Sequence, residues 1–166
     1  MCIGFATYIY MCFFSEYLLN ARERLQRLTL EYMEASDVKT LMDEIVDSLG
    51  LFHIVPQFVY CYRSKGSKSE RIIARIHGLG RIWQEALRRP STYLIEVISE
   101  RYDKLNDEEK EKTLIHELLH IPKGFSGGFR PHKGYVNSKR VESMHRKLVE
   151  KRSLNERAEN VDVHDR

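Results

Sequence analysis

The stretch that most constrains the fold is residues 106–121, NDEEKEKTLIHELLHI. Asn106 is a good N-cap residue, and Glu109 stands three positions later, where a capping box needs it. The acidic residues that follow Asn106 suit the positive end of the helix dipole. Apolar residues then recur at helical spacing until Pro122 and Gly124, which disfavour continuation. We therefore predict an amphipathic helix that ends just after residue 120.

This helix carries an HExxH motif formed by His116, Glu117 and His120. Residues four apart lie on the same face of a helix, so both imidazoles can reach a single ion. Zn²⁺ favours such ligands, and a catalytic site keeps its fourth position for water. Glu117 follows the first histidine, where its carboxylate can take the proton of a metal-activated water. The motif thus predicts peptide hydrolysis with Glu117 as the general base.

The competing interpretation is a structural helix with incidental histidines, because HExxH fixes only three positions. A second feature favours the metal site: His132 follows His120 after a glycine-rich loop that can fold back. We therefore predict that His116, His120 and His132 bind Zn²⁺.

The remaining sequence predicts an α+β domain with a small mixed β-sheet and helices flanking the active-site helix. Helical spacing marks residues 15–35, and a second helix is expected over 36–50 with Ser36 as its N-cap. Residues 81–90 fit either a strand or a helix. The other expected elements are a strand in 52–64, a turn or hairpin tip in 65–69, a returning strand in 71–80, a strand in 91–99, a loop in 122–131 and a helix in 137–153.

The chain has 166 residues, which fits one domain with its own core. We expect an apolar extension over residues 1–20, a metallopeptidase-like domain over 21–152 and a flexible tail over 153–166. Three cysteines without a CxxC pair fit a reducing cytoplasm. The first residues are apolar, but no Lys or Arg precedes Arg22 and Glu16 interrupts the run. No stable membrane association is therefore expected, with a membrane anchor as the alternative.

The strand TYLIEVIS, the HExxH helix, the glycine-rich loop and the following RPHKGY together resemble the zincin metallopeptidases. They are similar to the small metallopeptidases of archaea and phages, whose core is SprT-like or WSS1-like. The resemblance implies that His132 is the third ligand, with Tyr135 as the aromatic residue three positions later. It also implies that the strand Tyr93–Ile98 is the edge on which an extended peptide substrate lies.

The sequence departs from two zincin subgroups. Ser126 stands where metzincins carry a histidine, and no clear downstream glutamate motif of the gluzincin type follows. Glu142 is nevertheless an alternative third ligand. Arg130, Tyr135 and His145 are candidates for stabilising the oxyanion of the tetrahedral intermediate, although Tyr135 and His145 also fit ordinary packing and surface roles.

Basic residues are frequent after Gly128, with eight Lys or Arg between residues 130 and 152. A solvated helix face explains them, and so does a surface for DNA. SprT-like proteases act on DNA-bound proteins, so DNA is a possible partner beside the peptide or protein substrate. The favoured function is a cytoplasmic zinc metallopeptidase. The alternative is a nucleic-acid-associated protein whose zinc site is mainly structural or whose peptidase activity is vestigial.

Overall fold

The computed structural model describes residues 30–162, and these form an α+β fold around one four-stranded sheet. The expected fold class is therefore confirmed. In chain order the elements are β1 (Glu31–Glu34), α2 (Ser36–Ser48), η1 (Pro56–Phe58), β2 (Val59–Lys65), β3 (Ala74–Gly78), α3 (Arg81–Leu87), β4 (Tyr93–Ile98), α4 (Ser99–Tyr102), α5 (Asp107–Leu119), α6 (His132–Tyr135) and α7 (Ser138–Asp162).

The sheet is mixed and its strands are not in sequence order. The order is β1-β2-β4-β3, with β2 and β4 parallel and the other two pairings antiparallel. β4 is buried almost throughout because it lies between two neighbouring strands. β3 therefore forms one edge of the sheet, and β1 forms the other.

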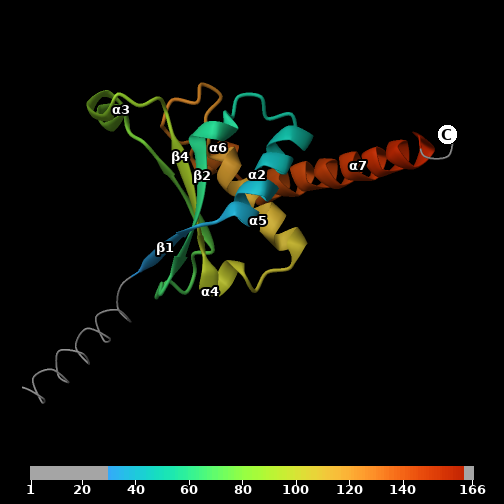
Figure 1. The fold of residues 1–166 in the computed structure, drawn as a ribbon, viewed down its shortest axis with the longest axis horizontal. Helices are drawn as coiled ribbons and strands as arrows, with labels where there is room; N and C mark the ends of the chain where they lie inside the picture. Colours follow the sequence, from blue (N-terminus) through green and yellow to red (C-terminus); the bar gives the residue numbers. More distant parts are fainter. Residues whose placement is uncertain (1–29, 163–166) are drawn as a thin grey trace, which may run out of the picture.

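Helices α2, α5 and α7 lie together on one side of the sheet (Figure 1). The hydrophobic core fills the space between these helices and the sheet. Its largest fully buried side chains come from every layer: Met42 and Ile45 of α2, Tyr93 and Ile95 of β4, Leu114, Ile115 and Leu118 of α5, and Leu148 of α7. Most of α5 thus lies against the core, and only part of its surface faces solvent.

Helix α5 forms as the local sequence predicts. The Asn106 side chain accepts a hydrogen bond from the Glu109 backbone N–H at 2.8 Å. The Glu109 carboxylate accepts one from the Asn106 backbone N–H at 3.1 Å. This capping box satisfies two backbone donors that would otherwise lack partners. It fixes where the helix begins and hence which residues face the core.

Several expected boundaries are wrong. Residues 31–34 form a strand, not the end of a helix, and the rest of the expected helix over 15–35 lies outside the described residues. Ser36 is the first residue of α2, and its N-cap is Ala35 without a side-chain hydrogen bond. The strand expected over 52–64 begins only at Val59, because Pro56 lacks a backbone N–H for a strand ladder and starts the short helix η1 instead.

Of the two interpretations of residues 65–69, turn or hairpin tip, the hairpin is wrong, because β2 and β3 are not paired. β3 does return antiparallel, but its partner is β4, which inserts between β2 and β3. β4 is the most apolar of these strands, and burial on both sides favours the sheet interior for such a strand. The ambiguous segment 81–90 contains the helix α3, and α7 continues to Asp162, well past the end expected near residue 153.

The apolar extension expected over residues 1–20 lies outside the described residues. Within residues 30–162, no helix is long and apolar enough to cross a bilayer.

Candidate metal centre

The centre is built on the side of α5 that faces the cleft. Its apolar residues are packed into the core, so the histidines one turn apart, His116 and His120, project from the same side of the helix. The helix ends at Leu119, with His120 as its C-cap. The second histidine therefore lies where the chain leaves the helix, next to the loop that brings the third.

The loop over residues 122–131 returns to the end of α5 through a reciprocal pair of hydrogen bonds. The Arg130 backbone N–H donates to the His120 carbonyl oxygen at 2.8 Å. The His120 imidazole Nδ1 lies 2.7 Å from the Arg130 carbonyl oxygen. A carbonyl can only accept, so His120 carries its proton on Nδ1 and presents the lone pair of Nε2 to the other rings.

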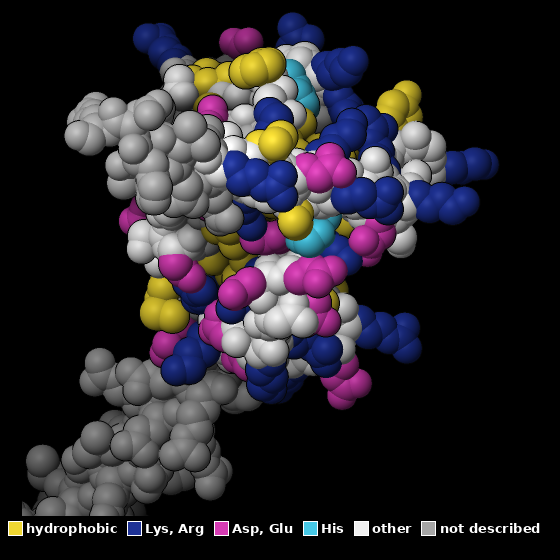
Figure 2. All heavy atoms as spheres, turned by 90° about the vertical axis from the view of Figure 1, so that its right-hand side faces the viewer, with side chains coloured by type: hydrophobic (Ala, Val, Ile, Leu, Met, Phe, Trp, Pro, Cys, Tyr) yellow, Lys and Arg dark blue, Asp and Glu magenta, His cyan; other side chains and the backbone are white. Residues whose placement is uncertain are grey.

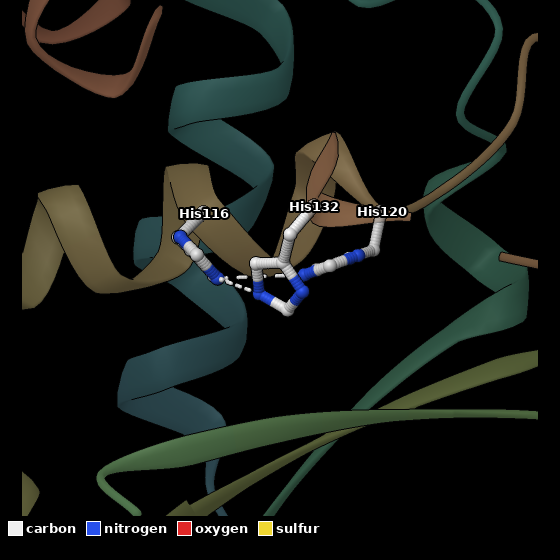
Figure 3. A group of neighbouring side chains, drawn as sticks. All are labelled: His116, His120 and His132. Carbon is white, nitrogen blue, oxygen red and sulfur yellow. Dashed lines mark hydrogen bonds between the residues drawn. The ribbon is translucent and has the colours of Figure 1, made fainter. Parts of the chain in front are cut away.

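His132 follows two residues after Arg130 and points toward the two helical histidines (Figure 3). Its Nε2 lies 3.2 Å from Nε2 of His116, which lies 3.4 Å from Nε2 of His120. One ligand nitrogen from each residue falls within 4.8 Å of the others. Nitrogens about 2.0–2.1 Å from a tetrahedral ion would be about 3.3–3.4 Å apart. The three rings therefore fit a single metal ion of that size.

The electrostatics of the cluster also suit a cation. Burial, together with the neighbouring rings of His120 and His132, lowers the pKa of His116 to about 4. His116 is therefore neutral at physiological pH, and its lone pair is free for coordination. A cluster of neutral imidazoles this close is compatible with a shared positive ion, but not with a positive charge on every ring.

Glu117 lies beside the cluster and is almost fully buried, with 7% of its surface exposed. Burial raises its pKa to about 7, opposed by a hydrogen bond with the backbone of Ile76. Among residues 30–162, no Lys, Arg or His forms an ion pair with it. A carboxyl group that titrates near neutrality can both take up and release a proton.

The backbone of Ile76 reaches Glu117 because only every second residue of β3 directs its backbone polar groups toward β4. Ile98 donates to the Ile73 carbonyl, and Leu79 donates to the Thr92 carbonyl. Antiparallel hydrogen-bonded pairs recur at every second residue, so Ala74, Ile76 and Gly78 turn their backbone groups away from β4. The open edge of the sheet therefore faces the histidine cluster.

A cleft of about 700 Å³ lies between this edge and the helices. One wall is formed by residues 71–76, and the opposite wall by α5 and the start of α7. The three histidines and Glu117 line it together with the apolar side chains of Ile72, Phe129 and Val141. The candidate centre thus lies in the lining of a cleft that the open sheet edge also bounds.

The other residues suggested by the sequence lie in different settings. Glu142 lines the cleft, but its carboxylate accepts a hydrogen bond from Lys112 at 2.7 Å. Tyr135 is about half exposed, and the guanidinium carbon of Arg130 lies 6.0 Å from the centre of its ring. Neither Tyr135 nor Arg130 lines the cleft. The contact that Arg130 makes with the centre is through its backbone, to His120.

His145 does not join the centre. It is buried between α5 and α7, and its Nε2 donates to the Glu111 carboxylate at 2.8 Å. Sequence reasoning had placed it on the polar side of the last helix with a possible site role. The structure shows a buried partner for it instead, which a single sequence could not indicate because Glu111 is 34 residues away.

Sequence reasoning missed two backbone groups, the Ile76 amide beside Glu117 and the Arg130 carbonyl beside His120. Backbone groups leave no residue-type signal, so only the folded chain reveals them.

The chain also matches a known protein family. The family model described as "Putative phage metallopeptidase" matches residues 30–151. No curated protein and no solved structure matches the chain.

Proposed function

Because the chain belongs to the putative phage metallopeptidase family, we propose that it hydrolyses peptide bonds with a zinc ion held by His116, His120 and His132. The observation that carries this proposal is the approach of three imidazole nitrogens at the spacing of tetrahedral ligands. An all-nitrogen donor set of this kind suits Zn²⁺ well. Three protein ligands would leave one coordination position for the reaction.

In this proposal zinc supplies Lewis acidity, which polarises the peptide carbonyl and lowers the pKa of water. Glu117 takes the proton of the attacking water on its carboxylate and then gives it to the nitrogen of the departing amine. Its pKa of about 7 suits both transfers. The Nδ1–H of His120 remains hydrogen-bonded to the Arg130 carbonyl oxygen. This bond keeps the ring oriented with Nε2 toward the centre.

The substrate would lie along β3. The resemblance to zincins had implied Tyr93–Ile98 as the substrate-binding edge, but β4 is interior and has strands on both sides. β3 is the edge beside the cleft, and its residues Ala74 and Ile76 direct their backbone groups away from β4. An extended peptide could add to this edge by main-chain hydrogen bonds, which recognise a chain without requiring one sequence.

We also propose that the core is of the SprT-like or WSS1-like type, which the order of strand, HExxH helix, loop and third histidine supports. The domain would span residues 21–152, between an extension over 1–20 and a tail over 153–166. A cytoplasmic location remains part of the proposal.

DNA binding stays a prediction. Of the eight basic residues between 130 and 152, Arg152 forms ion pairs with Glu44 of α2 and Glu111 of α5. The face toward which α7 points mixes Lys and Arg with Asp and Glu (Figure 2). This mixture gives no specific support to the nucleic-acid-associated alternative.

The proposed function is tested on the purified full chain by elemental analysis and by hydrolysis of an unfolded protein such as casein. We expect one zinc per chain, loss of hydrolysis in excess chelator and its recovery when zinc is restored. The assays run near pH 7, where metal-binding histidines are neutral. Hydrolysis that continues in chelator, or a chain that retains no metal, would overturn the proposal.

The third ligand is tested by comparing His132→Ala with Glu142→Ala. Loss of an outer-shell partner costs about 10–100-fold in metal affinity, and loss of a ligand should cost more. We expect that larger loss for His132→Ala and nearly parental affinity for Glu142→Ala, whose carboxylate is paired with Lys112. The reverse result would assign the third position to Glu142.

A further inference from the structure

We propose that Tyr93 is a positioning residue for the metal centre, because its buried hydroxyl fixes the glycine loop that delivers His132 and orients His120. The inference rests on the proposed function, since it concerns the same three ligands. Tyr93 belongs to β4 and touches none of them directly. Its influence would pass through the loop over residues 125–130.

The Tyr93 hydroxyl makes two hydrogen bonds to consecutive glycines of the loop. It accepts one from the Gly127 backbone N–H at 2.9 Å and donates one to the Gly128 carbonyl oxygen at 2.9 Å. The side chain has no solvent exposure. A phenolic hydroxyl that is both donor and acceptor inside the core fixes the direction of the loop backbone at this point.

The ring of Tyr93 contacts the aromatic residues at both ends of this segment. It packs edge-to-face against Phe125, with centroids 4.9 Å apart, and against Phe129, with centroids 6.0 Å apart. Such pairs favour defined orientations over free rotation. Phe129 also lines the cleft. The ring and the hydroxyl of Tyr93 therefore both position residues 125–129, including Phe129 in the lining of the cleft.

The other side of the loop is held by α3 and the end of β3. The Gln84 side-chain amide donates to the Leu79 carbonyl at 2.6 Å and to the Ser126 carbonyl at 3.3 Å. Gly127 has φ +83, and a Cβ there would overlap Gln84 and Leu79. A Cβ on Gly78 would lie 2.6 Å from the Gly127 carbonyl oxygen. The loop thus has little room to shift.

The position of the loop decides the position of two ligands. Arg130 follows Gly128 by two residues, and its backbone forms the reciprocal pair of bonds with His120. His132 follows by two more. A displaced loop would loosen the Arg130 carbonyl from the His120 ring and move His132 away from the helix. Both changes reduce metal affinity, whereas a hydroxyl that serves the core alone would leave it unchanged.

The test is Tyr93→Phe in the full chain, which keeps the ring and removes only the two hydrogen bonds. Zinc affinity is measured by competition with a chromophoric chelator, and the unfolding of the metal-free protein is followed in parallel. We expect zinc affinity to fall by about 10–100-fold, the usual cost of losing support around a ligand. The visible spectrum of the cobalt-substituted protein should also change, because ligand geometry changes.

Tyr102→Phe is the matched control. Tyr102 is equally buried, and its hydroxyl has no hydrogen-bond partner among residues 30–162. Its removal should leave zinc affinity and the cobalt spectrum at parental values. Equal zinc affinity of Tyr93→Phe and the parent would overturn the inference, and so would an equal loss in both variants. A parent that binds no zinc would instead contradict the proposed function.

If the Tyr93→Phe variant does not fold, the Gln84→Ala variant tests the same inference. Helix α3 buries no residue, so this change does not threaten the core. It removes the contacts to Leu79 and Ser126 from the opposite side of the loop. A several-fold loss of zinc affinity would support loop positioning, and parental affinity would overturn it.

Discussion

Helix α5 carries two buried glutamates in opposite settings. Glu111, near the start of the helix, accepts hydrogen bonds from His145 at 2.8 Å and from Arg152 at 2.5 Å. Glu117, near the end, is equally buried, yet no basic side chain of the described chain pairs with it. The two regions thus share a helix, a residue type and a degree of burial, but not their partners.

The histidines of the two regions differ in the same way. His145 has a carboxylate as its partner, so its hydrogen-bonding needs are met within the protein. Among residues 30–162, the hydrogen-bond partners of His116 Nε2 are two other imidazoles. Buried polar groups that have hydrogen-bond partners within the protein stabilise its structure. Buried imidazoles that face only one another are instead typical of a binding or catalytic site. The hydrogen-bond partner, not the residue type, therefore distinguishes the stabilising region around Glu111 from the candidate centre around Glu117.

The largest expected effect is on catalysis, and it should distinguish the two glutamates. Glu117→Gln removes the proposed general base while keeping the shape of the side chain. We expect hydrolysis to fall by about 10²–10⁴-fold, with zinc content unchanged. Turnover of casein and elemental analysis measure the two quantities.

Glu111→Gln is the control on the same helix. The folded fraction of this variant should turn over substrate at close to the parental rate, because Glu111 is not among the residues that line the cleft. An equal loss of activity in both variants, or full turnover by Glu117→Gln, would contradict the different roles of the two glutamates.

The second effect is on stability in the presence of metal. A ligand that binds only the folded state at 100 times its dissociation constant stabilises that state by about 2.7 kcal/mol. We expect added zinc to raise the free energy of unfolding of the parent and of Glu111→Gln by similar amounts. His132→Ala should show much less of this gain at the same zinc concentration. Chemical denaturation with and without zinc provides the measurement, and an equal gain in all three proteins would place the metal elsewhere.

The smallest effect is on the stability of the metal-free protein. Glu111→Gln removes the charge that His145 and Arg152 share between α5 and α7. Weakening buried hydrogen bonds of this kind costs about 1–3 kcal/mol. The metal-free Glu111→Gln protein should therefore unfold more easily than the parent, whereas Glu117→Gln should not, since Glu117 has no cation to lose. A Glu111→Gln protein as stable as the parent would show that the network contributes little.

The features that depend on neighbours along the chain follow from the order of the residues alone. The capping box of Asn106 and Glu109, the course of α5 and the shared face of His116 and His120 all follow from residue spacing within a few turns. Hydrogen bonds and side-chain contacts three or four residues apart are nearly independent of the rest of the fold. The strand Tyr93–Ile98 is also predicted from the local sequence, because a short run of apolar and β-branched residues favours a buried strand.

The other features depend on contacts between segments that are distant in the sequence, and these contacts exist only in the folded chain. β4 took the interior position because its apolar residues gain most from burial on both sides, and this left β3 as the edge beside the cleft. His132 lies beside α5 because the loop before it is hydrogen-bonded to Tyr93 and Gln84. His145 lies away from the candidate centre and forms a hydrogen bond with Glu111. Such choices depend on which segments compete for the same buried space. That competition involves the whole chain at once, so no local pattern records its outcome.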